Sequence, residues 1–433
     1  MRENRYFLLG LLTLIGVLNF VDRYILSILL ESIKADLHLT DRQLGLLSGF
    51  YFAVFYSLFG IPIAMIADRW HRGKLISLSL MVWSAMTLVS GWAASFTHLI
   101  GARIGVGLGE AGVAPACHSL ITERFAPSQR PTAFAVYAVG GTMGILIALG
   151  VGGWINQHFG WRTAFIAAGL PGIFLTLFAW FLIHEPRRSD DLSLGMFTPK
   201  PGQASFGKGL ATLWKIPAWR HAAIAAAITH IATYGIGQFA PSLLSRSFEL
   251  KSGTVGLILA LVIGLGGSIG ALAGGIVASR LSAWRGVGWL AFTLAITFSV
   301  AGLLAPLALA QHELPMLLVF LAPYYVLSLT SSGVQFAIAQ SMVSPNMRAI
   351  SSAMLILITN LVGLGMGPLI VGQISDLLKP FLGAESLRYA MMCMTPLLFW
   401  GAGHFYLAGR HLPHDVLDEL RPGDHIALAE RTG

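Results

Sequence analysis

Four ionisable side chains interrupt two long apolar stretches in the first part of the chain. Asp22 and Arg23 lie in the stretch around 7–30, and Arg103 and Glu110 lie in the stretch around 98–122. A charge at the centre of a membrane helix costs about 2.5–3.5 kcal/mol on insertion scales, so each must face water or a partner. The chemistry open to this set is proton binding by a carboxyl group, under the influence of a neighbouring guanidinium.

The spacing of these residues predicts how they share a site. Arg103 and Glu110 are seven residues apart, which places both on one helix face roughly 10 Å apart. Gly107, between them on that face, leaves room for a neighbouring helix, a ligand or water. We expect Asp22 and Glu110 to be the proton-linked acids, with neither ranked above the other. Arg23 and Arg103 are expected to be counter-ions for a carboxylate or for an anionic substrate headgroup, whereas the alternative is a static ionic lock between the two helices.

The second half of the chain has no Asp, Glu, Lys or Arg at the centre of a predicted span. Its polar groups are milder, and each could serve only as an interhelical hydrogen bond, worth about 0.6 kcal/mol. A charged first half and a largely apolar second half suit an amphiphile better than a sugar, which would need polar groups on both sides. We expect the cavity to be lined by polar side chains of both halves, namely Asn19, Tyr234, Gln238, Gln335 and Asn360.

Composition excludes most other classes of protein. Of the 433 residues, 55% are hydrophobic and 11% are charged, against about 25% charged in a soluble domain. The two cysteines, Cys117 and Cys393, cannot build a disulfide framework or a metal motif. No ATP-binding motif, and no nucleophile paired with a base, is present in the sequence. We therefore expect no enzyme activity, no cofactor, no metal and no nucleic acid partner, although the formal net charge is +8.

Hydropathy predicts twelve membrane spans and an all-α integral membrane fold. A span needs about 20 mostly apolar residues, and in lipid it must be helical. The two stretches that contain the four charges are two of the twelve. The other ten are free of Asp, Glu, Lys and Arg, and they are 43–67, 75–102, 131–161, 163–184, 221–245, 252–279, 286–312, 314–347, 349–375 and 389–409.

The basic residues predict the orientation of these spans. With the N-terminus in the cytoplasm, the cytoplasmic segments hold 19 Lys and Arg and the outer loops hold 7. This ratio places both termini in the cytoplasm of a cell, or inner, membrane. The longest connection, 185–217, reads as a cytoplasmic linker with a short surface helix around 206–214.

The linker divides the chain into two halves that echo each other weakly. Ala67-Asp68-Arg69 has a counterpart in Ala278-Ser279-Arg280, and Gly152–Asn156 has one in Val371–Ser375. A six-plus-six repeat of this kind is typical of a rocker-switch transporter. The predicted organisation is an N-terminal bundle over 1–184, the linker over 185–217, a C-terminal bundle over 218–410 and a cytoplasmic tail over 411–433.

Several motifs resemble those of the major facilitator superfamily of transporters. The run from Ala67 to Lys74 resembles the family's D-R-x-x-R-[RK] signature, and Arg103–Ala111 and Gly160-Trp161-Arg162 also fit. The chain departs from the family where Gly144 is followed by Ile145 in place of the usual proline. The resemblance implies two pseudo-symmetric six-helix bundles, alternating access to a small-molecule or lipid-like substrate, and function as a monomer.

Within that superfamily, the first half resembles the Spinster group of lipid transporters. The residues that carry the resemblance are Asn19–Arg23, Phe55–Pro62 and Gly107–Ala111. Organic-anion symporters share the Asp-Arg and Arg-Glu pairs. The implied function is proton-coupled secondary transport of an amphiphilic or lipid-like organic anion. The alternatives are symport of a small organic acid and, less favoured, multidrug efflux.

The resemblance also implies a cytoplasmic gate around Asp68. In the family this acid locks the two halves when the cavity opens outward, and it meets the N-terminal end of a helix whose dipole favours an anion. That helix is expected to begin near Arg348. Arg69, Arg72 and Arg348 complete the predicted gate, and the alternative is an ordinary positively charged cytoplasmic loop.

Overall fold

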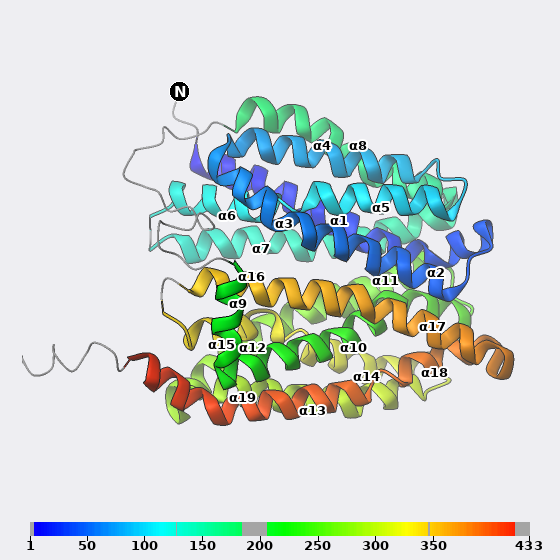
Figure 1. Cartoon of the computed structure of the whole chain (residues 1–433). Helices are drawn as coiled ribbons and strands as arrows, with labels where there is room; N and C mark the ends of the chain where they lie inside the picture. Colours follow the sequence, from blue (N-terminus) through cyan, green and yellow to red (C-terminus); the bar gives the residue numbers. More distant parts are fainter. Residues whose placement is uncertain (1–3, 127, 184–205, 345–346, 421–433) are drawn as a thin grey trace, which may run out of the picture. The chain divides into compact units, whose positions relative to one another are not determined.

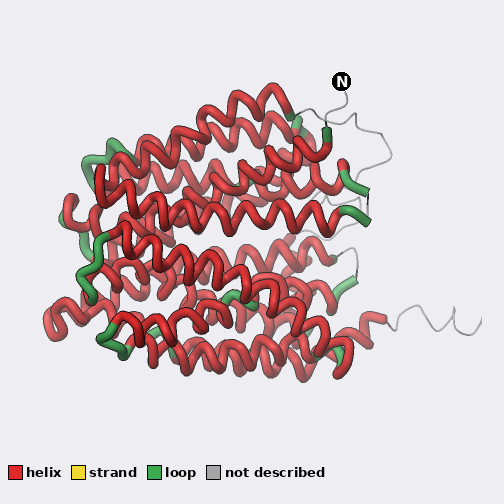
Figure 2. The backbone as a smooth tube through the Cα atoms, turned by 180° about the vertical axis from the view of Figure 1, so that it is seen from behind, coloured by secondary structure: helices red, strands yellow, loops and turns green. Residues whose placement is uncertain are grey.

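The computed structural model describes residues 4–126, 128–183, 206–344 and 347–420. Throughout this part of the chain the regular elements are helices, with short turns between them (Figure 2). This is the outcome that hydropathy predicts, because lipid offers no partner to a free backbone amide. Most of the predicted linker, 185–205, and the end of the predicted tail lie outside the described residues.

The first half of the chain forms six long helical segments. Three of them are interrupted by a short π-helical segment or by a break at glycine. Gly160 has a left-handed φ of 83° and divides α8 into two crossings. The elements are α1 (Arg5–Leu37), α2 (Asp41–Gly45), η1 (Leu46–Phe50), α3 (Tyr51–Arg69), α4 (Arg72–Ser90), α5 (Phe96–Glu110), α6 (Val113–Arg124), α7 (Arg130–Leu146), η2 (Ile147–Val151) and α8 (Gly152–Leu182).

The second half begins with a short amphipathic helix, α9 (Phe206–Lys215), where the sequence predicts one, and continues with six more crossings. The elements are α10 (Pro217–Ser247), α11 (Ser252–Leu259), η3 (Ala260–Leu265), α12 (Gly266–Arg285), α13 (Trp289–Leu309), α14 (Leu314–Ser328), α15 (Ser331–Ser341), α16 (Arg348–Ile358), η4 (Thr359–Leu364), α17 (Gly365–Leu382), η5 (Gly383–Glu385), α18 (Ser386–Met392) and α19 (Pro396–Leu420).

These helices account for the twelve predicted spans. Within the described residues, nine helical stretches are long and apolar enough to cross a membrane. Two of the nine, 132–182 and 350–413, each contain two crossings, and α10 provides the twelfth. Charge-free stretches overestimate some spans, since the uncharged turn Gly91–Ser95 lies inside the predicted span 75–102 and separates α4 from α5.

The internal repeat is visible in the π-helical segments. Such segments insert an extra residue into a helix and are frequent at functional sites. Leu46 and Ala260, where η1 and η3 begin, are 214 residues apart, and Ile147 and Thr359, where η2 and η4 begin, are 212 residues apart. These spacings agree with the repeat that the sequence motifs indicate. The two halves therefore have π-helical segments at equivalent positions, in addition to the same number of crossings.

The described residues form two compact units. The first contains Met1–Thr198, Gly235–Leu265 and Leu364–Met391, and the second contains Pro199–Tyr234, Gly266–Gly363 and Met392–Gly433, each within the described part of the chain. In the first unit α4 lies beside α8 and α1 beside α7, and in the second α13 lies beside α19 (Figure 1). The first unit therefore joins the first half of the chain to the last part of α10, to α11 and η3, and to α17, η5 and most of α18. The predicted division into two six-helix domains stays a prediction.

Glycines allow this close packing within the first unit. A β-carbon on Gly45 would overlap the backbone carbonyl of Pro368, and one on Gly49 would overlap that of Leu364. On the other side of the same contact, a β-carbon on Gly372 would overlap the carbonyl of Asp41. The α2–η1 segment and α17 therefore meet backbone to backbone, at a distance that only glycine permits.

Candidate functional site

The structure brings the four predicted membrane charges together inside the first unit. Glu110, at the end of α5, accepts a hydrogen bond from Nε of Arg23 on α1, at 2.7 Å. The Glu110 side chain is fully buried, whereas that of Arg23 is 22% exposed. Asn19, one turn earlier on α1, lies within reach of the same carboxylate. The partner of Arg23 is thus the acid on the neighbouring helix and not the adjacent Asp22.

Asp22 has a different environment, although it is equally buried at 1% exposed. The indole of Trp83 and the hydroxyl of Thr87, one turn apart on α4, face its carboxyl group. Even so, Asp22 Oδ1, Trp83 Nε1 and Thr87 Oγ1 each lack a hydrogen-bond partner among the described residues. Asp22 therefore has no ion-pair partner in the described part of the chain, and the nearby Arg103 charge acts on its carboxyl group without a direct hydrogen bond. This is a costly arrangement for a carboxylate in a dry interior.

Arg103 is the second buried cation of the site, 2% exposed. Its Nη1 donates to the backbone carbonyl of Asp22 in a long hydrogen bond of 3.4 Å, and not to that residue's carboxyl group. Nε of Arg103 and Oε1 of Glu110 have no hydrogen-bond partner among the described residues. The site therefore contains one complete ion pair and several unsatisfied polar atoms, which are costly in a dry interior.

The structure shows what occupies the space beside Gly107, which the sequence spacing leaves open. A β-carbon at this position would lie 2.9 Å from the carbonyl oxygen of Phe52 and 3.3 Å from the backbone nitrogen of Tyr56. The space beside Gly107 is thus filled by the backbone of α3, and not by a ligand or water. Phe52 and Tyr56 also flank the Arg23 guanidinium, with its Cζ 5.2 Å and 4.8 Å from the two ring centroids.

The milder polar residues predicted to line a cavity are placed on several helices. Tyr234 and Gln238 lie one turn apart on α10, Gln335 lies on α15 and Asn360 lies in η4. Gln238, Gln335 and Asn360 are buried, at 7%, 6% and 9% exposed. His230, on the same face as Tyr234, bonds instead to the carbonyl of Ala226 on its own helix at 2.8 Å. A shared cavity for these residues stays a prediction.

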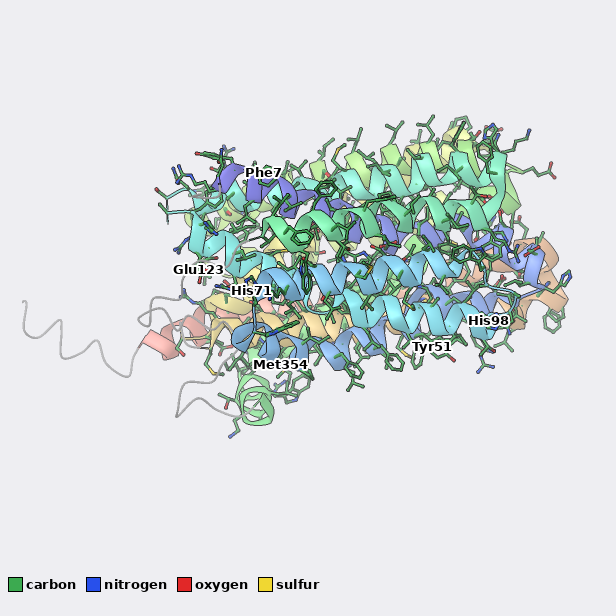
Figure 3. All side chains as sticks on the ribbon, turned by 90° about the horizontal axis from the view of Figure 1, so that it is seen from above. Phe7, Tyr51, His71, His98, Glu123 and Met354 are labelled. Atoms are coloured by element: carbon green, nitrogen blue, oxygen red, sulfur yellow. The ribbon has the colours of Figure 1, made fainter. Side chains whose placement is uncertain are left out.

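The predicted cytoplasmic gate is only partly within the described residues. Asp68 and Arg69 end α3, but their side chains lie outside the described part. Arg72, at the start of α4, is buried and forms a bidentate ion pair with Glu123 of α6 at 2.8 Å and 2.9 Å. Figure 3 labels Glu123 and the neighbouring His71 at one end of the molecule and His98 at the other. Arg348 is the exposed first residue of α16, and its role in a gate stays a prediction.

A second charged group lies in the first unit, at the ends of α1, α10 and α17, and sequence reasoning missed it. Asp41, 0% exposed, accepts hydrogen bonds from Lys34 at 2.5 Å, from Arg246 at 2.6 and 2.8 Å, and from Ser375 at 2.7 Å. Arg246 also holds Glu31 with two bonds, of 2.7 and 2.9 Å. These residues, together with Asp376, are called the Asp41 cluster below.

Asp376 completes the cluster by capping a helix. Its carboxylate accepts the backbone N–H groups of Asp41 at 3.0 Å and Arg42 at 2.8 Å, at the start of α2. A carboxylate at a helix N-terminus satisfies free amides and favours the helix dipole. The Asp41 cluster therefore binds α1 and α2, from the first half of the chain, to α10 and α17, from the second. Its residues gave no sequence signal because charges at helix ends are ordinary.

Comparison with known proteins agrees with this arrangement. The family model described as Major Facilitator Superfamily matches residues 12–368. An "MFS-type efflux pump" of Mycolicibacterium smegmatis is 31% identical over 95% of this chain and 94% of its own. The crystal structure of a bacterial homologue of the human lysosomal transporter Spinster, inward-facing and unoccupied, has a TM-score of 0.84. It is 27% identical, and the match covers 96% of this chain and 99% of that one.

A group of sugar-acid carriers matches over a shorter length. The "Probable galactarate/D-glucarate transporter" of Bacillus subtilis is 31% identical over 42% of this chain and 42% of its own. The structural likeness confirms the resemblance that the motifs of the first half indicate. It also confirms an all-helical fold with twelve spans, which makes the chain a multi-pass integral membrane protein.

Proposed function

Because the chain belongs to the Major Facilitator Superfamily, we propose that it is a proton-coupled secondary transporter of an organic anion with an apolar body. The observation that carries the proposal is the asymmetry of the two buried acids. Glu110 is paired with Arg23 at 2.7 Å, whereas Asp22 has no ion-pair partner among the described residues and carries an unsatisfied oxygen. An interior that served packing alone would gain more from apolar side chains.

The mechanism follows from what each group can exchange. Asp22 binds a proton while it is enclosed, since a neutral acid is less costly in a dry interior than a carboxylate. Arg23 remains charged throughout and holds either Glu110 or the anionic headgroup of the substrate. Substrate binding at Arg23 would release Glu110, which then takes up a proton of its own. Proton binding and substrate binding are thereby coupled through one guanidinium.

The amphiphilic substrate follows from the resemblance to the Spinster group of lipid transporters, and two relatives match over nearly their full length. One has the fold of a Spinster homologue, and another is described as an efflux pump. The charged groups of the first half would bind the headgroup, and apolar residues of the second half would bind the tail.

Symport of a small organic acid is the second candidate. The similarity to a galactarate/D-glucarate carrier supports it, and the same two arginines would bind the carboxylates. The match is restricted to 42% of each chain, so it informs on part of the molecule only. A small diacid would need no apolar surface, and this separates the two candidates experimentally.

The setting of the transporter is part of the proposal. The excess of basic residues in alternate loops supports a position in the inner membrane with both termini in the cytoplasm. The Asp41 cluster would then lie at the outer end of the helices, and Asp68 would act at the cytoplasmic gate. We propose that the monomer is the transporting unit.

A thermal-shift screen tests the substrate class. Purified protein in detergent is heated with lysophospholipids, sphingosine phosphate or galactarate. Each ligand is tested at pH 5 and pH 8, which lie roughly below and above the pH at which a buried carboxyl group loses its proton. Stabilisation by the lipid anions, altered by pH and lost in Arg23→Gln, supports the proposal. Stabilisation by galactarate alone would favour the second candidate, and pH-independent binding would count against proton coupling.

A further inference from the structure

The site formed by Asp22, Arg23, Arg103 and Glu110 is called the central site below. Its two arginines share one aromatic ring. Cζ of Arg23 lies 5.2 Å from the centroid of Phe52, and Cζ of Arg103 lies 5.4 Å from the same centroid. Each guanidinium is attracted to the ring by a cation–π interaction, whereas the two cations repel each other. Phe52 is 1% exposed, so no solvent screens these interactions at the ring itself.

The ring of Phe52 is held in place by its own helix and by α5. It stacks on Tyr56 with centroids 5.5 Å apart and an interplanar angle of 22°. The backbone of α3 meets α5 at Gly107, where a β-carbon would lie 2.9 Å from the Phe52 carbonyl oxygen. Gly107 stands between Arg103 and Glu110 in the sequence of α5. Phe52 is therefore anchored opposite the gap that separates these two charged residues.

Without an obstruction, the Arg103 side chain could extend along α5 toward the Glu110 carboxylate. Arg103 and Glu110 lie on one face of α5, two turns apart. Nε of Arg103 and Oε1 of Glu110 are both without a hydrogen-bond partner among the described residues. Nevertheless, Glu110 is paired with Arg23, and Arg103 is directed to the backbone of Asp22 instead.

We propose that Phe52 is a positioning residue that assigns each arginine to its own acid, an inference that rests on the proposed function. Its ring holds the Arg103 guanidinium beside Asp22 and leaves Glu110 to Arg23. Without the ring, Arg103 moves toward the free oxygen of Glu110. Asp22 then loses the positive charge beside it and binds its proton at a higher pH.

Infrared titration of the protein in lipid nanodiscs tests this assignment without a substrate. The carboxylic-acid band that disappears in Asp22→Asn is followed against pH in the wild type and in Phe52→Leu. We expect the midpoint of this band to rise by about 1 pH unit in Phe52→Leu. Phe52→Tyr, which keeps an aromatic ring, is expected to retain the wild-type midpoint.

Two controls separate this role from packing. Phe298→Leu removes another fully buried phenylalanine, which stacks on Phe405 with centroids 5.7 Å apart, and it should leave the midpoint unchanged. Phe52→Met, whose unbranched side chain adapts to an irregular space, should raise the midpoint as Phe52→Leu does, and it replaces that variant if the latter does not fold. An unchanged or lowered midpoint in a folded Phe52→Leu or Phe52→Met variant overturns the inference while leaving the proposed function intact. A wild type in which Asp22→Asn removes no titrating band overturns both.

Discussion

The central site and the Asp41 cluster contain similar charged residues, but their hydrogen bonding differs. The Asp41 carboxylate is fully hydrogen-bonded, whereas several polar atoms of the central site have no partner among the described residues. In the Asp41 cluster, the Asp41 carboxylate accepts four hydrogen bonds, from Lys34, Arg246 and Ser375, and Asp376 caps a helix. In the central site, Asp22, Arg103 and Glu110 each have a buried atom without a hydrogen-bond partner among the described residues. A fully satisfied network rigidifies a structure, whereas a partly satisfied one leaves buried polar groups at a cost, and we propose that the central site changes partners during transport.

This difference suggests a division of labour between the two regions. The Asp41 cluster joins elements from both halves of the chain, and it acts together with the glycine contacts of Gly45 and Gly49 to close one end of the first unit. The central site lies on helices of the first half alone, and we propose that it binds protons and substrate. Substitutions in the central site should therefore change transport, and substitutions in the Asp41 cluster should change local stability.

The largest effect is expected where the single complete ion pair of the central site is broken. Glu110→Gln leaves the Arg23 guanidinium without its counter-ion, a change that costs about 3–5 kcal/mol in buried pairs. Coupled transport in proteoliposomes should fall by at least about tenfold. The matched control is Glu123→Gln, since Glu123 pairs with Arg72 and its side chain is 31% exposed. Equal losses in the two variants would contradict the special role of Glu110.

A large but different effect is expected in the Asp41 cluster. Asp41→Asn removes the charge that holds Lys34 and Arg246, so the contact between α2 and α17 should open more often. Hydrogen exchange of the backbone amides in α2 and η1, followed by mass spectrometry, should become faster by at least about tenfold. Exchange as slow as in the wild type would show that the cluster does not close this end.

A β-carbon in the glycine contact should have a moderate effect. Gly45→Ala would overlap the carbonyl of Pro368, and overpacking of this kind costs about 1–3 kcal/mol. We expect a lower thermal unfolding temperature and the same faster exchange as in Asp41→Asn. Gly237→Ala is the control, because its β-carbon would meet nothing within 4 Å. If both variants unfold at the same temperature, the backbone contact is not tight.

The smallest effect is expected at an exposed ion pair. Asp36 and Arg162 are 2.6 Å apart, but both side chains are 43% exposed. Pairs of this kind contribute about 0–1 kcal/mol, so Asp36→Asn should unfold within a few degrees of the wild type and transport normally. A transport defect as large as that expected for Glu110→Gln would mean that the distance between the charges, and not their burial, decides how much an ion pair contributes.

Sequence reasoning was most successful where a charge stood out against an apolar background. Asp22, Arg23, Arg103 and Glu110 were predictable because each is expensive inside a span, and the structure does place them together. Their pairing was not predictable, because the spacing of residues along the sequence does not show that Arg23 on α1 contacts Glu110 on α5. Whether they carry protons stays a prediction.

The Asp41 cluster shows what sequence could not supply. Asp41 and Arg246 are 205 residues apart, and Asp41 and Ser375 are 334 apart. Each lies near a helix end, where a polar residue is normal, so only the tertiary packing reveals the group. The twelve spans were predictable from hydropathy, but the π-helical segments and the break at Gly160 were not, because they depend on local backbone geometry.

The proton movement that accompanies transport tests the account most directly. Liposomes that contain the protein and a trapped pH indicator are exposed to a gradient of the ligand that gives the largest thermal shift. The account predicts a ligand-driven pH change in the wild type that is lost in Asp22→Asn and in Glu110→Gln, while Asp22→Asn still exchanges ligand for ligand. A pH change of wild-type size in both variants would contradict it.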